Sequence, residues 1–506
     1  MHLAYKIIRP LLRKFVLAST CFLISTAVLA QKETSPPPLD WEDCPSDMAY
    51  RSSLNAQCLT LSPPLDYKNP NKDKIKLFIA RYPAQFDTNK GAPIFLLAGG
   101  PGQAGSDSFP SLMPALKPLR RNHDLILIDQ RGTGLSEELS CPQPDLDGAL
   151  EMEKEDIAKY TQECLDNISI DPRFFTSWEA ANDLDFIRKA LNQEHIILFG
   201  VSYGTRLATT YMRYFTSHVE KAILDGIVPV GEPLGLSHHI NLQRALELII
   251  ASCEEQKDCS EKFPDLHKKL MALPGMVGED GIELTIRNPY THEKTEYTLD
   301  DSMVRLLIRL YAYSPEQVAL LPWLIDQAYD ENWNAFAAQG LMIAEQLGDS
   351  ISGTLQNSVM CTEDFPLYRS RDTSSTFMDS EIIYSATELC KHWPTGYLGE
   401  NFREPLNIAT PTLLLSGEWD PVTPPSFADI LDQDLINSRH LIAAGQGHFI
   451  LPRGCTAQIA QHFLDDTELG DLDITCLDKL RAPDFFMNAN GPAMHSAASE
   501  ESKSND

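Results

Sequence analysis

One serine of this chain lies in a sequence context that suits a nucleophile. Ser202 is the centre of a Gly-x-Ser-x-Gly pattern, residues 200–204, which directly follows the apolar run 196–199. A buried strand that turns sharply into a helix lifts the hydroxyl to the rim of a sheet. Gly200 and Gly204 are then required because side chains there would collide with the neighbouring strand and helix. The pattern therefore predicts that Ser202 is a nucleophile.

A serine nucleophile needs a histidine base and a carboxylate that orients it, and both follow in the chain order Ser, Asp, His. Asp420 lies in the loop after the apolar segment 412–416, and His448 lies in the loop after the segment 440–444. Loops at the carboxyl ends of parallel strands share one rim, so we expect the three side chains to converge there. Taken singly, Asp420 reads as a turn residue before Pro421 and His448 as a loop histidine. Their joint order and context favour a catalytic triad.

The oxyanion of an acyl-transfer transition state needs backbone N–H donors aimed at it. A Gly-Gly-Pro-Gly loop at residues 99–102 follows the strand-like segment 93–97, so its amides are expected at the same rim. We assign the donors to Gly100 and to Tyr203, the residue after the nucleophile. The alternative is a Gly-Pro turn without a chemical role.

Taken together, these motifs resemble those of the α/β-hydrolase peptidases of the proline iminopeptidase and tripeptidyl aminopeptidase family. The matching segments are Gly-Gly-Pro-Gly at 99–102, Asp-Gln-Arg-Gly-Thr-Gly at 129–134, Gly-Val-Ser-Tyr-Gly at 200–204, Gly-Glu-Trp-Asp-Pro at 417–421 and Gly-His at 447–448. Ala98 stands where proline iminopeptidases usually have histidine, which favours the larger, secreted tripeptidyl-type branch. The resemblance implies exopeptidase activity at the free amino terminus of a peptide substrate, with no metal or organic cofactor.

The order of the expected elements agrees with an α/β-hydrolase fold. Strand-like segments at 93–97, 124–128 and 195–199 are separated by helical patterns such as 177–192, which is typical of a mostly parallel, doubly wound sheet. Helical patterns then dominate, as expected for an inserted cap that controls access to the rim. The predicted organisation is a signal peptide (1–30), an N-terminal linker (31–54), the first part of the core (55–232), a helical cap (233–403), the second part of the core with Asp420 and His448 (404–494) and a disordered tail (495–506).

The amino terminus has the features of a secretory signal peptide. Four basic residues between positions 6 and 14 precede an apolar run, 15–29, that closes on Val-Leu-Ala with cleavage expected after Ala30. A membrane anchor is the rival interpretation, but the run is shorter than the ~20 residues that span a bilayer. Cys21 lies within the run without a convincing lipidation box. We therefore expect a bacterial protein exported to the periplasm or the medium, with no membrane association after cleavage.

Cysteine usage agrees with export. One of the 11 cysteines lies in the predicted signal peptide, and the others are even in number, which favours disulfides in an exported protein. They fall into close sequential couples, and we predict the pairs Cys44–Cys58, Cys141–Cys164, Cys253–Cys259, Cys361–Cys390 and Cys455–Cys476. A metal site is the weaker alternative because no Cys-x-x-Cys or His-x-x-x-His spacing accompanies them.

The family resemblance and the cysteine pairing suggest a further site within the cap. Glu363 and Asp364 lie beside Cys361 in a loop that the predicted disulfide would staple, and either carboxylate is expected near the active site to receive a substrate ammonium. The alternative is a solvated acidic pair.

Charge excludes some partners and leaves other functions open. The net charge of −29 makes nucleic acid and anionic membranes poor partners, so we expect neither. A carboxylesterase with the same triad, or a non-catalytic α/β-hydrolase-fold binding protein, remains the alternative to a secreted serine aminopeptidase. The oligomeric state is not predicted.

Overall fold

The computed structural model describes residues 39–45, 54, 56–86, 90–139, 141, 154–278, 280–287, 292–348, 350–368, 376–378 and 387–493. The predicted signal peptide, most of the predicted linker and the predicted tail lie outside these ranges. Residues Asp40–Asp506 cluster as one unit.

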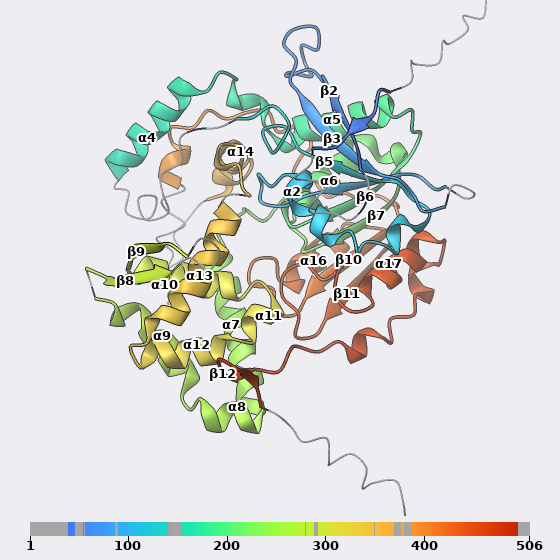
Figure 1. Cartoon of the computed structure of the whole chain (residues 1–506). Helices are drawn as coiled ribbons and strands as arrows, with labels where there is room; N and C mark the ends of the chain where they lie inside the picture. Colours follow the sequence, from blue (N-terminus) through green and yellow to red (C-terminus); the bar gives the residue numbers. More distant parts are fainter. Residues whose placement is uncertain are drawn as a thin grey trace, which may run out of the picture. The chain divides into compact units, whose positions relative to one another are not determined.

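A sheet of nine strands, counted over the described residues, forms the core of this unit (Figure 1). The strand order is β1-β2-β3-β5-β4-β6-β7-β10-β11, with antiparallel pairing from β1 to β5 and parallel pairing from β5 to β11. The strands are β1 (Glu42–Asp43), β2 (Gln57–Leu61), β3 (Leu77–Tyr82), β4 (Ile94–Leu97), β5 (Leu125–Ile128), β6 (Ile196–Val201), β7 (Val219–Asp225), β10 (Thr412–Gly417) and β11 (Ser438–Ala443). The central parallel strands are apolar and buried, as a sheet covered on both faces requires.

Helices cover both faces of the sheet. The helices α5 (Ser177–Ala190), α6 (Tyr203–Phe215) and α16 (Pro425–Asp432) pack on one face, and α17 (Thr456–Leu464) packs on the other with the segment 109–119. Successive strand residues alternate between the two clusters, as Leu96 and Leu97 of β4 do, because side chains along a strand point to opposite faces. The alternation of strands and helices expected from the sequence thus corresponds to a doubly wound α/β core.

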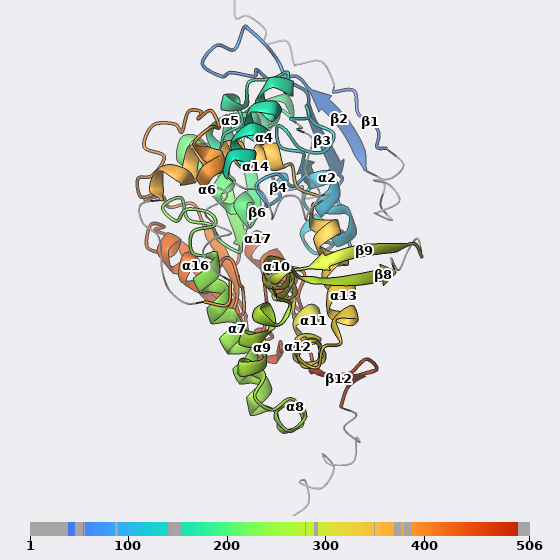
Figure 2. The same cartoon turned by 90° about the vertical axis from the view of Figure 1, so that its left-hand side faces the viewer.

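Between β7 and β10 the chain forms a largely helical cap with a hydrophobic cluster of its own, which includes Leu246, Leu307 and Phe336. Figures 1 and 2 both show most of its helices grouped on one side of the sheet. The cap elements are α7 (His238–Glu255), α8 (Lys257–Lys262), α9 (Leu266–Met276), β8 (Ile282–Arg287), β9 (Lys294–Leu299), α10 (Asp301–Tyr311), α11 (Pro315–Val318), α12 (Leu321–Tyr329), α13 (Trp333–Gly348) and α14 (Gly353–Val359). The antiparallel hairpin of β8 and β9 was not predicted from the sequence.

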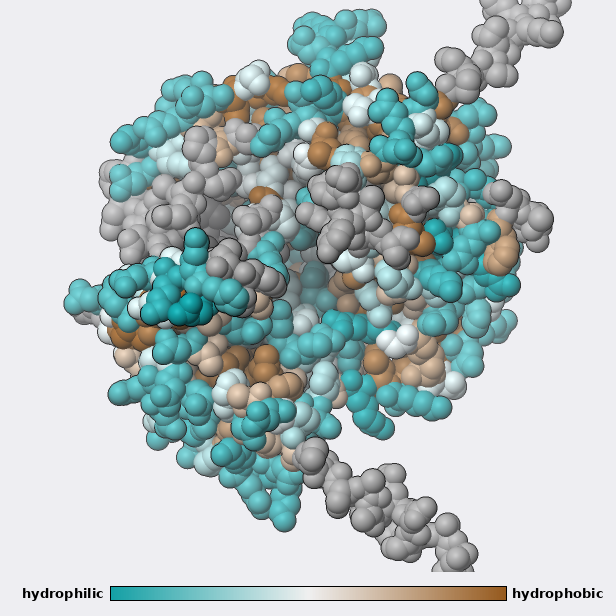
Figure 3. Space-filling view, in the orientation of Figure 1, coloured by the Kyte–Doolittle hydropathy of each residue, from teal (hydrophilic) through white to brown (hydrophobic). Residues whose placement is uncertain are grey.

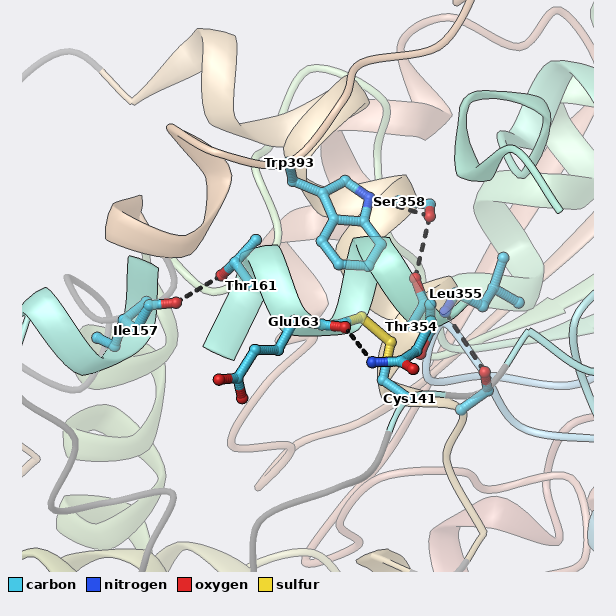
Figure 4. Close-up of a disulfide and its surroundings, with 11 residues drawn as sticks. Cys141, Ile157, Thr161, Glu163, Thr354, Leu355, Ser358 and Trp393 are labelled. Carbon is cyan, nitrogen blue, oxygen red and sulfur yellow. Dashed lines mark hydrogen bonds between the residues drawn. A yellow bond between two sulfur atoms is a disulfide. The ribbon is translucent and has the colours of Figure 1, made fainter. Parts of the chain in front are cut away.

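Two disulfides pack together where the cap meets the segment before the nucleophile. The helix α4 (Lys154–Asn167) lies beside α14 in both views (Figures 1 and 2). The disulfides Cys141–Cys164 and Cys361–Cys390 share a buried cluster with Trp393. Figure 4 shows the indole N–H of Trp393 directed at the Ser358 hydroxyl of α14, a hydrogen bond of 3.2 Å. The two disulfides thus place α4 and the segment that follows α14 in one packed cluster, although neither disulfide joins the two helices directly.

The structure joins the described cysteines in five disulfides, and these are the pairs expected from the sequence: Cys44–Cys58, Cys141–Cys164, Cys253–Cys259, Cys361–Cys390 and Cys455–Cys476. Among the helices described, none has both the length and the apolar character needed to cross a membrane.

Candidate active site

Ser202 occupies the sharp turn between β6 and α6. Its backbone has φ 54° and ψ −126°, a left-handed conformation that is strained for a residue with a side chain. A Cβ on Gly200 would lie 2.5 Å from the carbonyl oxygen of Gly204, and one on Gly204 would lie 2.1 Å from that of Leu97 in β4. Both glycines are therefore required by the close approach of helix and strand, which is the reason expected from the sequence.

Asp420 and His448 form a hydrogen-bonded pair after β10 and β11. The Nδ1 atom of His448 donates to Oδ2 of Asp420 at 2.7 Å. The carboxylate is fully buried and also accepts from the backbone N–H groups of Val422 and Thr423 and from the Thr423 hydroxyl, at 2.9, 2.8 and 2.7 Å. Because Nδ1 carries the shared proton, the pair leaves Nε2 of His448 as the basic nitrogen.

The surroundings of His448 set its basicity. Burial lowers the pKa of His448, but the Asp420 carboxylate outweighs burial, so the pKa lies above its ordinary value of 6.5. The backbone N–H of His448 donates to the carbonyl oxygen of Tyr313 in the cap at 2.9 Å, and the two rings meet edge to face at 5.6 Å between centroids. The cap thus helps to hold the imidazole in place.

A second buried carboxylate, that of Asp225, binds the loop that carries His448. Asp225, the last residue of β7, is fully buried and accepts hydrogen bonds from the backbone N–H groups of Ile450 and Leu451. Its own carbonyl oxygen accepts from the backbone N–H of Ser202 at 2.9 Å. Burial raises the pKa of Asp225 to about 7. Asp225 therefore contacts both the serine turn and the histidine loop.

The glycine-rich loop after β4 lies next to Ser202. A Cβ on Gly99 would lie 2.9 Å from the Cβ of Ser202, so only glycine allows this approach. Gly100 has φ 102° and lines the same cavity as Ser202. Tyr203 is the first residue of α6, where backbone N–H groups have no acceptor within the helix. Its side chain points elsewhere and shares a hydrogen bond of 2.8 Å with the Ser177 hydroxyl.

A cavity of about 520 Å³ opens between these loops and the cap. Core residues that line it include Gly100, Ser202 and His448, and cap residues include Arg309 and Tyr313. Its volume lies within the range of roughly 300–1,000 Å³ that is typical of small-molecule sites. The face in Figure 3 is mostly hydrophilic and is hollowed near its centre. The cap forms one wall of the cavity, as expected for an element that controls access.

Glu363 and Asp364 lie away from this cavity. The Glu363 carboxylate accepts from the backbone N–H and the hydroxyl of Ser177 at 2.7 and 2.8 Å, and Asp364 pairs with Arg206 of α6 at 2.8 Å. Both carboxyl groups are buried, and neither residue is among those lining the cavity. They are therefore not a solvated acidic pair, and the structure does not bring them to Ser202. Burial raises the pKa of Glu363 to about 7 and also raises the pKa of Asp364.

Several residues that the sequence did not single out take part in this site. Asp107 and Arg309 line the cavity with opposite charges, and Thr423 donates to the Asp420 carboxylate. Asp225 could have been recognised from the sequence, since it is the last residue of an apolar strand. Arg309 had none, because an arginine on an amphipathic helix is ordinarily a surface residue.

A metal centre is not formed by the described residues, among which no group of three or more His, Cys, Asp or Glu side chains is arranged to hold an ion. The chemistry that these residues offer is nucleophilic attack by a hydroxyl, with a carboxylate-oriented imidazole as base.

Comparison with known proteins gives the family. The family model described as alpha/beta hydrolase fold matches residues 92–257, and that of the TAP-like proteins matches residues 375–476. The putative hydrolase YuaR of Escherichia coli (strain K12) is 23% identical over 512 residues, covering 93% of this chain and 98% of that protein. Serine protease Hip1 of Mycobacterium tuberculosis (strain ATCC 25618 / H37Rv) is 24% identical over 427 residues, covering 76% of this chain and 81% of that protein.

A tripeptidyl aminopeptidase of Streptomyces coelicolor (strain ATCC BAA-471 / A3(2) / M145) is 28% identical over 221 residues, which cover 40% of this chain and 40% of that protein. The fold class and the family expected from the motifs are thus confirmed. The chain has the α/β-hydrolase fold and is a serine hydrolase, and these matches support its resemblance to the α/β-hydrolase peptidases of the proline iminopeptidase and tripeptidyl aminopeptidase family.

Proposed function

We propose that this protein is an exported serine aminopeptidase that hydrolyses short peptides from a free amino terminus through an acyl-enzyme. The observation that carries the proposal is the opening of Ser202 and His448 into one cavity beneath the cap, with His448 oriented by the buried Asp420. The peptidase names of two relatives support peptides as the substrate class.

In the proposed mechanism Nε2 of His448 removes the hydroxyl proton as Oγ of Ser202 attacks the scissile carbonyl carbon. Asp420 holds the imidazole tautomer and stabilises the imidazolium. The backbone N–H groups of Gly100 and Tyr203 receive the oxyanion. The carbon–nitrogen bond then breaks, and His448 protonates the leaving amine. Water hydrolyses the acyl-enzyme by the same steps in reverse, with His448 as the base.

Recognition of a free amino terminus requires an anion at a fixed distance from Ser202. Among the described residues that line the cavity, Asp107 carries the only carboxyl group. It lies on the short helix α2 (Gly105–Ser108), directly after the glycine-rich loop. This position supports Asp107, rather than Glu363 or Asp364, as the group that receives the substrate ammonium.

Export is supported by the five disulfides, because such bonds persist in oxidising compartments. The signal-peptide features of residues 1–30 support the same conclusion. We assign the mature protein to the periplasm or the extracellular medium of a bacterium.

The test compares three substrates with the mature protein: a short peptide with a free amino terminus, its amino-acetylated form and a simple aryl ester. We expect the free peptide to be cleaved about 30-fold or more faster in kcat/KM than the acetylated one, because acetylation removes the ammonium that the proposed Asp107 site would bind. Asp107→Asn should reduce that ratio, and Asp429→Asn on the exposed surface of α16 should not. Cleavage of the ester alone would favour a carboxylesterase, and no turnover of any substrate would favour a binding protein.

A further inference from the structure

Arg309 of α10 is a cation in the cavity wall, and the part of the chain that the structure describes provides it with no carboxylate partner. Its Nη2 donates to Nδ1 of His238 and to the hydroxyl of Tyr313, both at 3.1 Å. Among the described residues, no partner is present for its Nε, and none for its Nη1. A guanidinium has five N–H donors; Nη2 donates to His238 and Tyr313 and Nε is buried, so the two N–H groups of Nη1 are those left for a ligand.

Two fully buried arginines of this protein, Arg131 and Arg206, are paired with carboxylates. Arg131 contacts Asp183 at 2.7 Å, and Arg206 contacts Asp364 at 2.8 Å. Such pairing is the rule because an uncompensated charge out of water is costly. Arg309, which is partly buried in the cavity wall, has no such partner among the described residues.

The neighbours of Arg309 leave its charge uncompensated. Burial and the charge of Arg309 itself hold the pKa of His238 well below 6.5, so the imidazole is neutral and acts as a hydrogen-bond acceptor. The Tyr313 hydroxyl accepts the second hydrogen bond. Among the described lining residues the one carboxyl group is that of Asp107, in α2 on the core side of the cavity. An anionic ligand is the partner that this arrangement lacks.

The position of Arg309 relative to His448 indicates which part of a substrate it meets. The guanidinium lies 5.9 Å from the centre of the Tyr313 ring, and that ring contacts the imidazole of His448 edge to face. Arg309 is therefore separated from His448 by a single side chain. His448 protonates the leaving amine in the proposed mechanism, so the leaving group lies on this side of Ser202.

We propose that Arg309 binds a carboxylate of the leaving group, namely the free carboxyl terminus of a departing amino acid or short peptide. The proposal rests on the proposed function and adds a second recognition point to it. The cavity would bind both the free amino terminus and the free carboxyl terminus of a short peptide. Guanidinium and carboxylate form parallel charge-assisted hydrogen bonds, and these are strongest where water is partly excluded. A chain that continues beyond the leaving residue has no carboxylate there and loses the interaction.

The test measures kcat/KM for alanine peptides of two to five residues, each with a free and with an amidated carboxyl terminus. We expect the wild-type protein to prefer the free form of at least one length by about 10-fold or more, the value of a charge-assisted hydrogen bond. Arg309→Gln should bring this ratio close to one, and Arg309→Lys should keep part of it. A ratio near one at every length in the wild-type protein overturns the proposal without requiring any variant.

A matched control lies on the same helix. Arg305 pairs with Asp301 and does not line the cavity, so Arg305→Gln should leave the ratio of free to amidated peptides unchanged. If it lowers the ratio as much as Arg309→Gln does, the effect comes from α10 as a whole and the assignment to Arg309 fails.

A second set of substrates tests whether the carboxylate that Arg309 binds is the carboxyl terminus or an acidic side chain. Amidated peptides with glutamate or glutamine directly after the scissile bond place a carboxylate on the leaving group without a free carboxyl terminus. Equal rates for this pair agree with recognition of the terminus, whereas a glutamate preference without a terminal preference assigns Arg309 to an acidic side chain and contradicts the proposal. Loss of all peptide cleavage in the wild-type protein would instead refute the proposed function.

Discussion

The Asp225 carboxylate accepts a hydrogen bond of 2.7 Å from the backbone N–H of Leu451, three residues beyond His448. The same carboxylate accepts from the backbone N–H of Ile450 at 3.0 and 3.1 Å. The end of β7 is thereby joined to the loop that presents the imidazole. Asp225 touches no reacting atom, so its role is that of a positioning residue.

Asp225→Asn should therefore impair both stability and turnover. An amide oxygen at the Oδ2 position can accept from both N–H groups, but the NH₂ group then faces the Ile450 N–H. This donor–donor contact leaves a buried donor without an acceptor, at a cost of about 1–3 kcal/mol. Displacement of His448 by the relaxed loop should lower kcat/KM by on the order of 10²-fold. Urea denaturation and kinetics with an aryl ester measure the two effects. Asp429→Asn is the control, and wild-type kcat/KM in Asp225→Asn would contradict the positioning role.

The pH dependence of kcat/KM should report the environment of His448. The base must be neutral to accept the proton of Ser202, so activity rises with pH as His448 loses its proton. Because the pKa of His448 is raised, the acid limb should lie above 6.5. Asp420→Asn removes the carboxylate that raises this pKa, so the limb should move to lower pH while kcat falls by on the order of 10⁴-fold. A limb that stays in place in this variant would be inconsistent with the pair described here.

Asp364 should contribute to stability and not to amine recognition. Asp364→Asn removes a charged partner of the fully buried Arg206, and breaking such a pair typically costs about 3–5 kcal/mol. Asp301→Asn, which affects a half-exposed pair with Arg305, should cost at most about 1 kcal/mol. Denaturation curves test this difference. If Asp364→Asn instead reduced the preference for free over acetylated peptides with stability unchanged, the expectation from the sequence would be restored.

The parts of the site that could be predicted from the sequence are those with local causes. The turn at Ser202 needs glycine at positions 200 and 204 because of contacts with adjacent backbone, and this requirement is visible within five residues. Asp420 and His448 each follow an apolar strand, so their shared rim follows from the topology of a parallel sheet.

The parts of the site that could not be predicted depend on contacts between segments far apart in the sequence. Asp364 meets Arg206 across 158 positions of the chain, and no local pattern distinguishes an acidic pair that binds a substrate from one that binds a buried arginine. Arg309 reaches the cavity only because α10 packs over the rim. The hairpin of β8 and β9 did have a local signal, since the residues Ile282, Leu284 and Ile286 alternate with polar ones, but the surrounding helical pattern concealed it.

The central claim is that Ser202 forms the acyl-enzyme. The most direct test is rapid acid quenching of the mature protein during turnover of an aryl ester, followed by proteolysis and mass analysis of the peptides. We predict one acyl group, located on the peptide that contains Ser202 and absent in Ser202→Ala, which should also lose several orders of magnitude in kcat. An acyl group on another residue, or Ser202→Ala with more than about a tenth of the wild-type kcat, would contradict the account.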